Sequence, residues 1–181
     1  MTSITIKDVW KYYGKTMAVK ELNIEVRDNE FLCLLGPSGC GKSSTLRMLA
    51  GLEFISSGEI FFGDLKVNDI PPRDRDIAMV FQNYAIFTHM TVYENLAYGL
   101  RAAGVAKAER DRRVRDMAEF LHLSPLLKKP AAGLSVNILQ RLAIGRSAIM
   151  EPAIFLLDEP LSNVDAAFRA VMRTELKHLQ R

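Results

Sequence analysis

The stretch GPSGCGKS, residues 36–43, decides the fold. It matches the pattern G-x-x-x-x-G-K-[ST], in which glycines let the backbone curl until several N–H groups point at a phosphate chain. The apolar run FLCLL precedes it at residues 31–35, and good helix formers follow it, so the motif lies at a strand-to-helix turn whose helix N-terminus attracts anions. The motif predicts a nucleotide phosphate site; the alternative is an ordinary glycine-rich turn between a strand and a helix.

Two side chains of this motif have a chemical task. Lys42 is placed to reach the β- and γ-phosphates, and the hydroxyl of Ser43 is a ligand for Mg²⁺. The neighbouring residues would surround the phosphates. The predicted nucleotide-binding set is therefore Gly36, Pro37, Ser38, Gly39, Cys40, Gly41, Lys42, Ser43 and Ser44.

A second apolar run, AIFLL at residues 153–157, ends in the acidic pair Asp158 and Glu159. Runs that are apolar at every position are typical of strands covered on both faces of a parallel sheet, and ligands of open α/β sheets bind at the carboxyl ends of the strands. Asp158 would hold Mg²⁺, directly or through water, and Glu159 would orient and deprotonate an attacking water. The alternative for the pair alone is a solvated turn before Pro160.

Composition indicates a globular chain of about one domain. Of its 181 residues, 49% are apolar and 25% are charged, and 24 basic against 21 acidic side chains give a net charge of +3. This charge is too small to indicate a nucleic-acid or membrane-surface partner by itself. No apolar stretch approaches the roughly 20 residues that span a bilayer, so we expect a soluble chain with at most a peripheral role at a membrane.

The order of the expected elements indicates an α/β core interrupted by a helical insert. Alternating apolar and polar residues predict half-buried strands near residues 4–7 and 22–26, and a hairpin is expected around Gly63-Asp64. An apolar strand is also expected at residues 77–81. Helical composition and stripes predict helices at residues 95–103, 107–121, 135–148 and 166–181.

Further motifs resemble those of the ATP-binding subunit of an ABC transporter. Besides the phosphate loop, they are Val80-Phe-Gln-Asn83, Leu157-Asp-Glu-Pro160 and Leu161-Ser-Asn-Val-Asp165. The stretch at residues 73–100 is similar to the branch that drives bacterial sugar importers of the maltose type. Because the resemblance runs through essentially the whole chain, it implies an ATPase subunit that powers solute import, with two copies closing around two ATP molecules.

The resemblance also implies an architecture and a set of partners. The fold would be a P-loop NTPase core, with a RecA-like mixed or parallel sheet and an antiparallel β subdomain, plus a helical subdomain. The implied boundaries are residues 1–88 for the core, 89–147 for the helical subdomain and 148–181 for the return to the core. ATP and Mg²⁺ would bind, the partners would be transmembrane permease subunits and a second ATPase subunit, and the place would be peripheral, at the cytoplasmic face of the cell membrane.

Residue roles follow by the same resemblance. Tyr13 would stack on the adenine, unless it is one more aromatic packing a strand with Trp10 and Tyr12. Gln82 would contact Mg²⁺ and water and join the core to the helical insert, unless it is simply a polar residue after an apolar strand. Asp165 would cross between two subunits or would be a helix N-cap.

The surface that receives the coupling helix of the membrane subunit would be residues 84–98. This branch usually has proline where Thr88 stands, so the local turn is expected to differ.

The signature motif departs from the family pattern. The family has Leu-Ser-Gly-Gly-Gln, and this chain has Leu134-Ser-Val-Asn-Ile138. Ser135 would still donate its hydroxyl to the γ-phosphate of an ATP on the other subunit. Val136 adds a β-branched side chain that disfavours positive φ, and Ile138 replaces a polar side chain with an apolar one. We expect weaker dimer closure, with the loss in turnover rather than in binding.

A second departure concerns the histidine that contacts the γ-phosphate in the family. It ends a buried strand that lies between the phosphate-loop strand and the strand before Asp158, and none of His89, His122 and His178 follows such a run. We therefore expect the chain to be a fragment or truncated product. The alternative function is a nucleotide-binding module with little or no turnover. A GTPase switch is not supported, because no Asn-Lys-x-Asp motif occurs, and the transported solute stays open.

Overall fold

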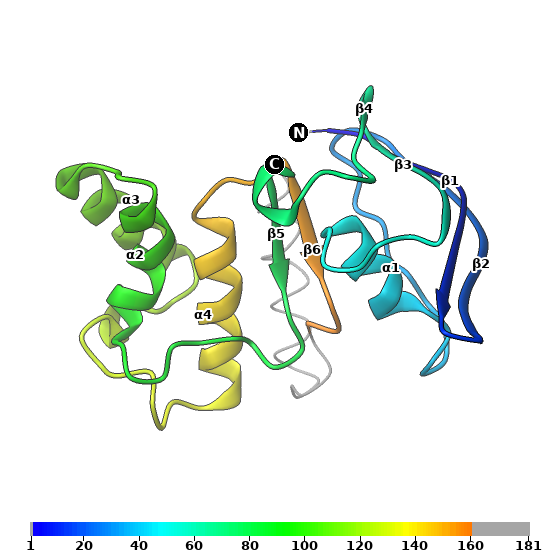
Figure 1. Ribbon diagram of the computed structural model, residues 1–181. Coiled ribbons are helices and arrows are strands. Elements are labelled where there is room, and N and C mark those ends of the chain that lie inside the picture. Colours follow the sequence, from blue (N-terminus) through cyan, green and yellow to red (C-terminus); the bar gives the residue numbers. More distant parts are fainter. Residues whose placement is uncertain (1, 161–181) are drawn as a thin grey trace. The chain divides into compact units, whose positions relative to one another are not determined.

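The computed structural model describes residues 2–160 and divides this part of the chain into two compact units. Unit 1 contains residues 2–79 and 152–158, and unit 2 contains residues 80–151 together with 159–160 (Figure 1). Each unit has its own hydrophobic core. The helix expected at residues 166–181 lies outside the described residues. Within residues 2–160, no helix has both the length and the apolar character needed to cross a membrane.

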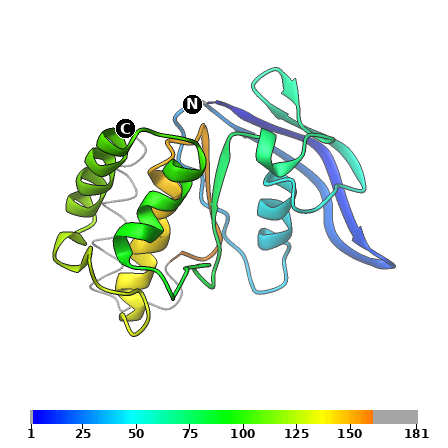
Figure 2. The ribbon, with the colours of Figure 1, turned by 60° about the vertical axis from the view of Figure 1, so that its left-hand side comes forward.

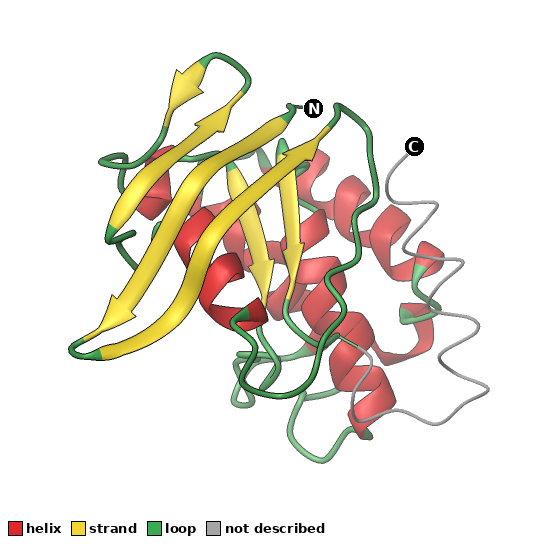
Figure 3. Ribbon diagram, turned by 90° about the vertical axis from the view of Figure 1, so that its right-hand side faces the viewer, coloured by secondary structure: helices red, strands yellow, loops and turns green. Residues whose placement is uncertain are grey.

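Unit 1 contains an antiparallel sheet that within the described chain has four strands in the order β2-β1-β3-β4 (Figure 3). Ile4 on β1 pairs with Val26 on β2 and with Phe62 on β3, so β1 is a central strand. The expected strands and the hairpin at Gly63-Asp64 are present. The strand bounds are Ile4–Tyr13 for β1, Thr16–Val26 for β2, Ser57–Phe62 for β3 and Leu65–Lys66 for β4.

A second sheet of the described chain pairs β5, Ile77–Val80, with β6, Ile154–Leu157. The two strands run in the same direction (Figure 3). Helix α1, Lys42–Leu49, begins inside the phosphate motif, and Met48 of this helix shares a core with Leu156 of β6. The expected strand at residues 153–157 is therefore present, although its residues alternate between buried and half-buried positions instead of being covered on both faces.

A buried arginine closes the C-terminal end of α1. Arg75, which follows the short 3₁₀ helix Pro72–Asp74, donates from Nη1 to the carbonyl oxygens of Met48 and Leu49, both at 2.9 Å. Burial lowers the pKa of the Arg75 guanidinium from its ordinary value. A cation at this end complements the negative pole of the helix, so α1 is anchored opposite to the end that carries the phosphate motif.

The strand expected at residues 31–35 is absent, and this prediction was wrong. Phe31, Leu32 and Leu35 are 51%, 45% and 89% exposed, and the segment forms no strand. An extended segment becomes a strand only when its N–H and C=O groups bond to a neighbouring strand. In the described chain β5 and β6 bond to each other, and no strand is paired with residues 31–35, so the apolar pattern is present without the pairing that would bury it.

Unit 2 is built on the helices expected from the sequence (Figure 2). Its core contains Leu96 and Leu100 of α2, Val114 of α3 and Leu142 of α4, each at most 1% exposed. Helix α2 begins earlier than expected, because Thr91 and Glu94 form a capping box. The bounds are Val92–Ala102 for α2, Lys107–Phe120 for α3 and Val136–Ala148 for α4, with a short 3₁₀ helix at Ser124–Leu126.

A buried asparagine fixes the loop that leads into α2. Asn95 is fully buried, and its side chain accepts from the N–H of Phe87 at 3.0 Å. Its amide nitrogen donates to the carbonyl oxygens of Phe87 at 3.0 Å and Thr91 at 2.9 Å. These bonds hold residues 87–91 in one conformation, because a buried amide that loses such partners is left unsatisfied.

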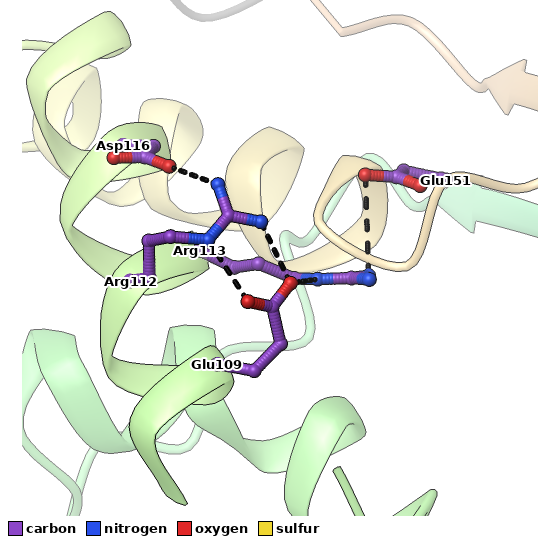
Figure 4. Close-up of polar contacts among 5 residues, drawn as sticks. All are labelled: Glu109, Arg112, Arg113, Asp116 and Glu151. Carbon is purple, nitrogen blue, oxygen red and sulfur yellow. Dashed lines mark hydrogen bonds and ion pairs between the residues drawn. The ribbon is translucent and has the colours of Figure 1, made fainter. Parts of the chain in front are cut away.

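The charged residues of α3 form a network on the surface of unit 2 (Figure 4). Glu109 bonds to Arg112 and to Arg113, both at 2.7 Å, over the i,i+3 and i,i+4 spacings of a helix. Arg112 also meets Asp116 at 3.0 Å, and Arg113 lies 3.9 Å from Glu151. Hydrogen bonds from Arg112 and Arg113 lower the pKa of Glu109 from 4.5 to about 2.

We predict that Glu109 keeps its charge far into the acid range. Because its pKa is lower in the folded chain, its contribution to stability is fully present above pH 4.5 and is lost as the pH falls toward 2. Glu109→Gln should therefore flatten the pH dependence of the unfolding free energy in this window, and NMR titration of the wild type should give a midpoint near 2. Glu119→Gln, an exposed change on the same helix, is the control. A Glu109 midpoint near 4.5 would contradict the network.

Candidate functional site

The glycines of the phosphate motif lie where the backbone has positive φ or where other atoms approach closely. Gly41 is the N-cap of α1 with φ of 94°, and a Cβ there would lie 2.7 Å from the carbonyl oxygen of Ala18. Gly39 has φ of 81°. A Cβ on Gly36 would lie 2.6 Å from Sγ of Cys40. The loop thus curls in a way that positive φ and close approach both reserve for glycine.

Lys42 lies over the loop that it follows. Its Nζ donates to the carbonyl oxygens of Gly36 at 2.8 Å and Pro37 at 2.9 Å. The first turn of α1, all of it within the described chain, contains no acidic residue, so nothing there cancels the positive end of the helix. An ammonium group and a helix N-terminus on one loop form a site for a phosphate chain.

The phosphate loop and the end of β6 meet through one hydrogen bond in unit 1. The hydroxyl of Ser43 donates to Oδ1 of Asp158 at 2.9 Å, and Asp158 is only 6% exposed. A hydroxyl and a carboxylate oxygen are hard donors of the kind that Mg²⁺ prefers. Residues 2–160 contain no group of three or more His, Cys, Asp or Glu side chains that could hold a metal. This donor set fits an ion that takes its other ligands from phosphate and water.

A second polar pair lies in unit 2. Nε2 of Gln82, which follows β5 in the sequence, donates to Oε2 of Glu159 at 3.3 Å. Glu159 has φ of 49°, which is uncommon for a residue other than glycine. Asp158, the acceptor in unit 1, and Glu159, the acceptor in unit 2, are consecutive residues of the chain.

The other expected nucleotide contacts are more exposed. Tyr13 at the end of β1 is 42% exposed, and Nζ of Lys11 lies 4.6 Å from its ring centroid. Trp10 and Tyr12 stack on each other with centroids 6.2 Å apart, and Tyr13 is not part of that stack. The remaining loop positions are exposed or half-buried, and they are Pro37, Ser38, Cys40 and Ser44. Asp165 lies outside the described residues.

The signature segment leads directly into α4. Ser135 is the exposed N-cap of this helix, and within residues 2–160 its hydroxyl makes no capping bond. The expected conflict between Val136 and positive φ does not arise, because Val136 is the first helical residue and has helical dihedrals. What Val136 adds is a side chain that is 46% exposed. Ile138 packs against the core of unit 2, where an apolar side chain is favourable.

Comparison with known protein families matches residues 19–162 to the family described as ABC transporter. The chain belongs to the ABC transporter family. It is 52% identical over its whole length to the trehalose/maltose import ATP-binding protein MalK of Thermococcus litoralis. It is 54% identical to the sn-glycerol-3-phosphate import ATP-binding protein UgpC 3 of Rhizobium etli. The chain spans about half the length of these curated relatives, 50% and 52% respectively.

Solved structures confirm the expected P-loop NTPase fold of this family. A dimeric ATP-binding cassette, MJ0796 in a post-hydrolysis state with ADP and Pi, is similar with a TM-score of 0.87 and 27% identity, over 98% of this chain and 83% of that one. A nucleotide-free ATP-binding cassette has a TM-score of 0.86 over 99% of this chain and 78% of that one. At 23% identity the second likeness concerns the fold alone.

Sequence reasoning missed residues that support the site from a distance. Asn95 and Arg146 bond to the backbone of the segment after Gln82, and neither belongs to a motif that predicts such a bond. For Asn95 a signal was available, because a polar residue among the apolar positions of a helix indicates a buried hydrogen bond. The dependence on Arg146 has no comparable signal, since its partner is a carbonyl oxygen 61 residues earlier.

We predict that two glycine substitutions in the phosphate loop have unequal effects. Gly39→Ala meets no atom within 4 Å, so only its positive φ is unfavourable, about 1 kcal/mol. Gly41→Ala adds a clash with the Ala18 carbonyl, for a total loss of about 2–4 kcal/mol. Denaturant unfolding of both variants beside the wild type measures the difference. Equal losses would contradict the close approach of residues 18 and 41.

Proposed function

We propose that the chain binds ATP with Mg²⁺ and hydrolyses it as the ATP-binding subunit of an ABC importer. The observation that carries this proposal is the 2.9 Å bond between Ser43 and Asp158, because it brings a phosphate loop and a carboxylate to one place in unit 1. The names of the relatives support the importer role, since both are import ATP-binding proteins. A sugar or another small polar solute is the corresponding substrate of transport.

The phosphate end of ATP lies in the loop of residues 36–44. The N–H groups of the loop donate to phosphate oxygens, and the ammonium of Lys42 exchanges the carbonyl oxygens of Gly36 and Pro37 for the β- and γ-phosphates. Ser43 and Asp158 are the residues of unit 1 that would hold Mg²⁺. When bound there, the ion supplies neutralisation of the charge that develops on the phosphates.

Glu159 accepts the proton of the attacking water. The water oxygen forms a bond to the γ-phosphorus as the bond to the bridging oxygen breaks, so the products are ADP and phosphate and the proton passes to the carboxylate. The amide of Gln82, 3.3 Å from that carboxylate, orients it and the water. Lys42 stabilises the charge on the leaving oxygens.

The complete machine is a pair of ATPase subunits attached to transmembrane permease subunits. Tyr13 stacks on the adenine, and Ser135 of one subunit donates to the γ-phosphate held by the other. Asp165 crosses between the subunits, and residues 84–98 receive a coupling helix of the permease. This arrangement places the chain peripherally at the cytoplasmic face of the membrane, with no nucleic acid involved.

One observation favours a second function, a nucleotide-binding module with little turnover. Val136 presents a 46% exposed β-branched side chain beside Ser135, at a position where the family resemblance has glycine. Extra side-chain volume hinders the close approach of another subunit to the N-terminus of α4. Binding in unit 1 would persist, and hydrolysis that depends on closure would be lost.

We predict that two substitutions separate binding from hydrolysis. Lys42→Ala should weaken MgATP binding at least tenfold, since it removes a charge-assisted contact of about 1.5–3 kcal/mol. Glu159→Gln should keep the affinity and slow phosphate release by about 10²–10⁴-fold, because the general base is lost. Calorimetry and a phosphate-release assay measure the two quantities, and Lys128→Ala, an exposed lysine of unit 2, is the control.

The wild-type chain decides between the two functions in the same assays. Binding with phosphate release supports the ATPase, and binding without it supports the module. A folded wild type that does not bind MgATP would contradict both.

A further inference from the structure

The segment after Gln82 contains a strained turn. Tyr84 and Ala85 are consecutive residues other than glycine with φ of 62° and 46°. Such conformations are unfavourable for residues other than glycine, and they persist only where neighbouring groups hold them. Local bonds close the turn: the N–H of Tyr84 donates to the carbonyl of Phe81 at 2.9 Å, and that of Ala85 to the carbonyl of Asn83 at 2.8 Å.

Arg146, near the end of α4, bonds to this turn from outside. Its Nη1 donates to the carbonyl oxygen of Ala85 at 2.7 Å, and its guanidinium lies 4.6 Å from the ring centroid of Phe87. A charge-assisted bond and a cation–π contact therefore act on residues two apart in the chain. Arg146 thus contacts both the strained Ala85 and Phe87, which follows the turn.

The Phe87 ring that contacts Arg146 is held in place by other residues of unit 2. Phe87 packs against Tyr98 of α2 with centroids 4.7 Å apart, and its N–H is held by the buried Asn95 at 3.0 Å. The guanidinium consequently rests on a part of unit 2 that is anchored in its core. The strained turn has a rigid support on one side and Gln82 on the other, three residues before Ala85.

We propose that Arg146 is a positioning residue: by holding the strained Tyr84-Ala85 turn it keeps the amide of Gln82 against the carboxylate of Glu159. All of these groups belong to unit 2. The catalytic consequence rests on the proposed function, in which Gln82 and Glu159 act on the attacking water. Loss of Arg146 then lowers turnover and leaves the phosphate loop of unit 1 intact.

Hydrogen exchange of the backbone amides of residues 83–87 tests the hold on the turn directly. Arg146→Met should speed this exchange about tenfold or more, because a hydrogen bond from a charged group of about 1.5–3 kcal/mol is lost. Arg146→Lys should give a smaller change, since lysine keeps the charge but not the flat, forked guanidinium. Arg101→Met is the matched control, because Arg101 lies over Tyr98 at 5.9 Å and does not hold the turn.

A compensating substitution distinguishes strain from general packing. Glycine adopts the φ of Ala85 without the penalty of a Cβ, so Ala85→Gly in the Arg146→Met background should slow the exchange again, about fivefold or more. Core amides of α2 and α3 report global stability in the same spectra. If Arg146→Met unfolds unit 2 as a whole, the milder Arg146→Lys variant decides, and it must loosen residues 83–87 ahead of the core.

Unchanged exchange at residues 83–87 in Arg146→Met would overturn the proposal, and so would a failure of Ala85→Gly to slow it. MgATP affinity and phosphate release are measured on the same variants. Arg146→Met is expected to keep the MgATP affinity and to lower kcat. A fall of kcat in the control Arg101→Met equal to that in Arg146→Met would also overturn the proposal. A wild type that does not bind MgATP contradicts the proposed function alone, because the exchange readout needs no nucleotide.

Discussion

The hydrogen bond from Ser43 to Asp158 is the interaction on which the rest of the site depends. Ser43 lies in the first turn of α1, and the buried Asp158 follows the end of β6. Oγ of Ser43 lies 2.9 Å from Oδ1 of Asp158. Without this bond, the phosphate loop would be an anion-binding turn and the acidic pair a solvated one. With it, hard oxygen donors and a cationic loop belong to one body, which is the requirement for holding a metal and a phosphate chain together.

In the proposed function, hydrolysis depends on residues that lie next to a strained turn of unit 2. Glu159 follows Asp158 directly, and its partner Gln82 is followed by a turn with two residues in unfavourable backbone conformations. Rigid packing in unit 2 supports that turn through Asn95, Phe87 and Arg146. Strain at such a position is tolerated where a side chain must be aimed, so turnover is expected to be more sensitive to mutation in unit 2 than nucleotide affinity is.

Local rules predicted most of the described helices and strands, and they predicted that the phosphate loop and Asp158 lie together. The phosphate motif, the strand-end rule for Asp158 and helical periodicity needed only neighbouring residues, and the structure has the corresponding elements. The prediction of a strand at residues 31–35 was wrong because a strand also needs a neighbouring segment to pair with. The apolar pattern of residues 31–35 contains no information about that neighbour. The predicted conflict between Val136 and positive φ is absent because helix α4 begins at this residue. Arg146 was missed because its acceptor is a backbone carbonyl 61 residues away, which carries no sequence signal.

A double-mutant cycle tests most directly whether Ser43 and Asp158 serve one ion. ATP affinity would be measured for the wild type, Ser43→Ala, Asp158→Asn and the double variant, with Mg²⁺ and again with EDTA. A shared ion predicts a coupling energy of at least ~1 kcal/mol with Mg²⁺ that shrinks when the metal is removed. Effects that add within ~0.5 kcal/mol in the presence of Mg²⁺ would contradict convergence on one magnesium–nucleotide site.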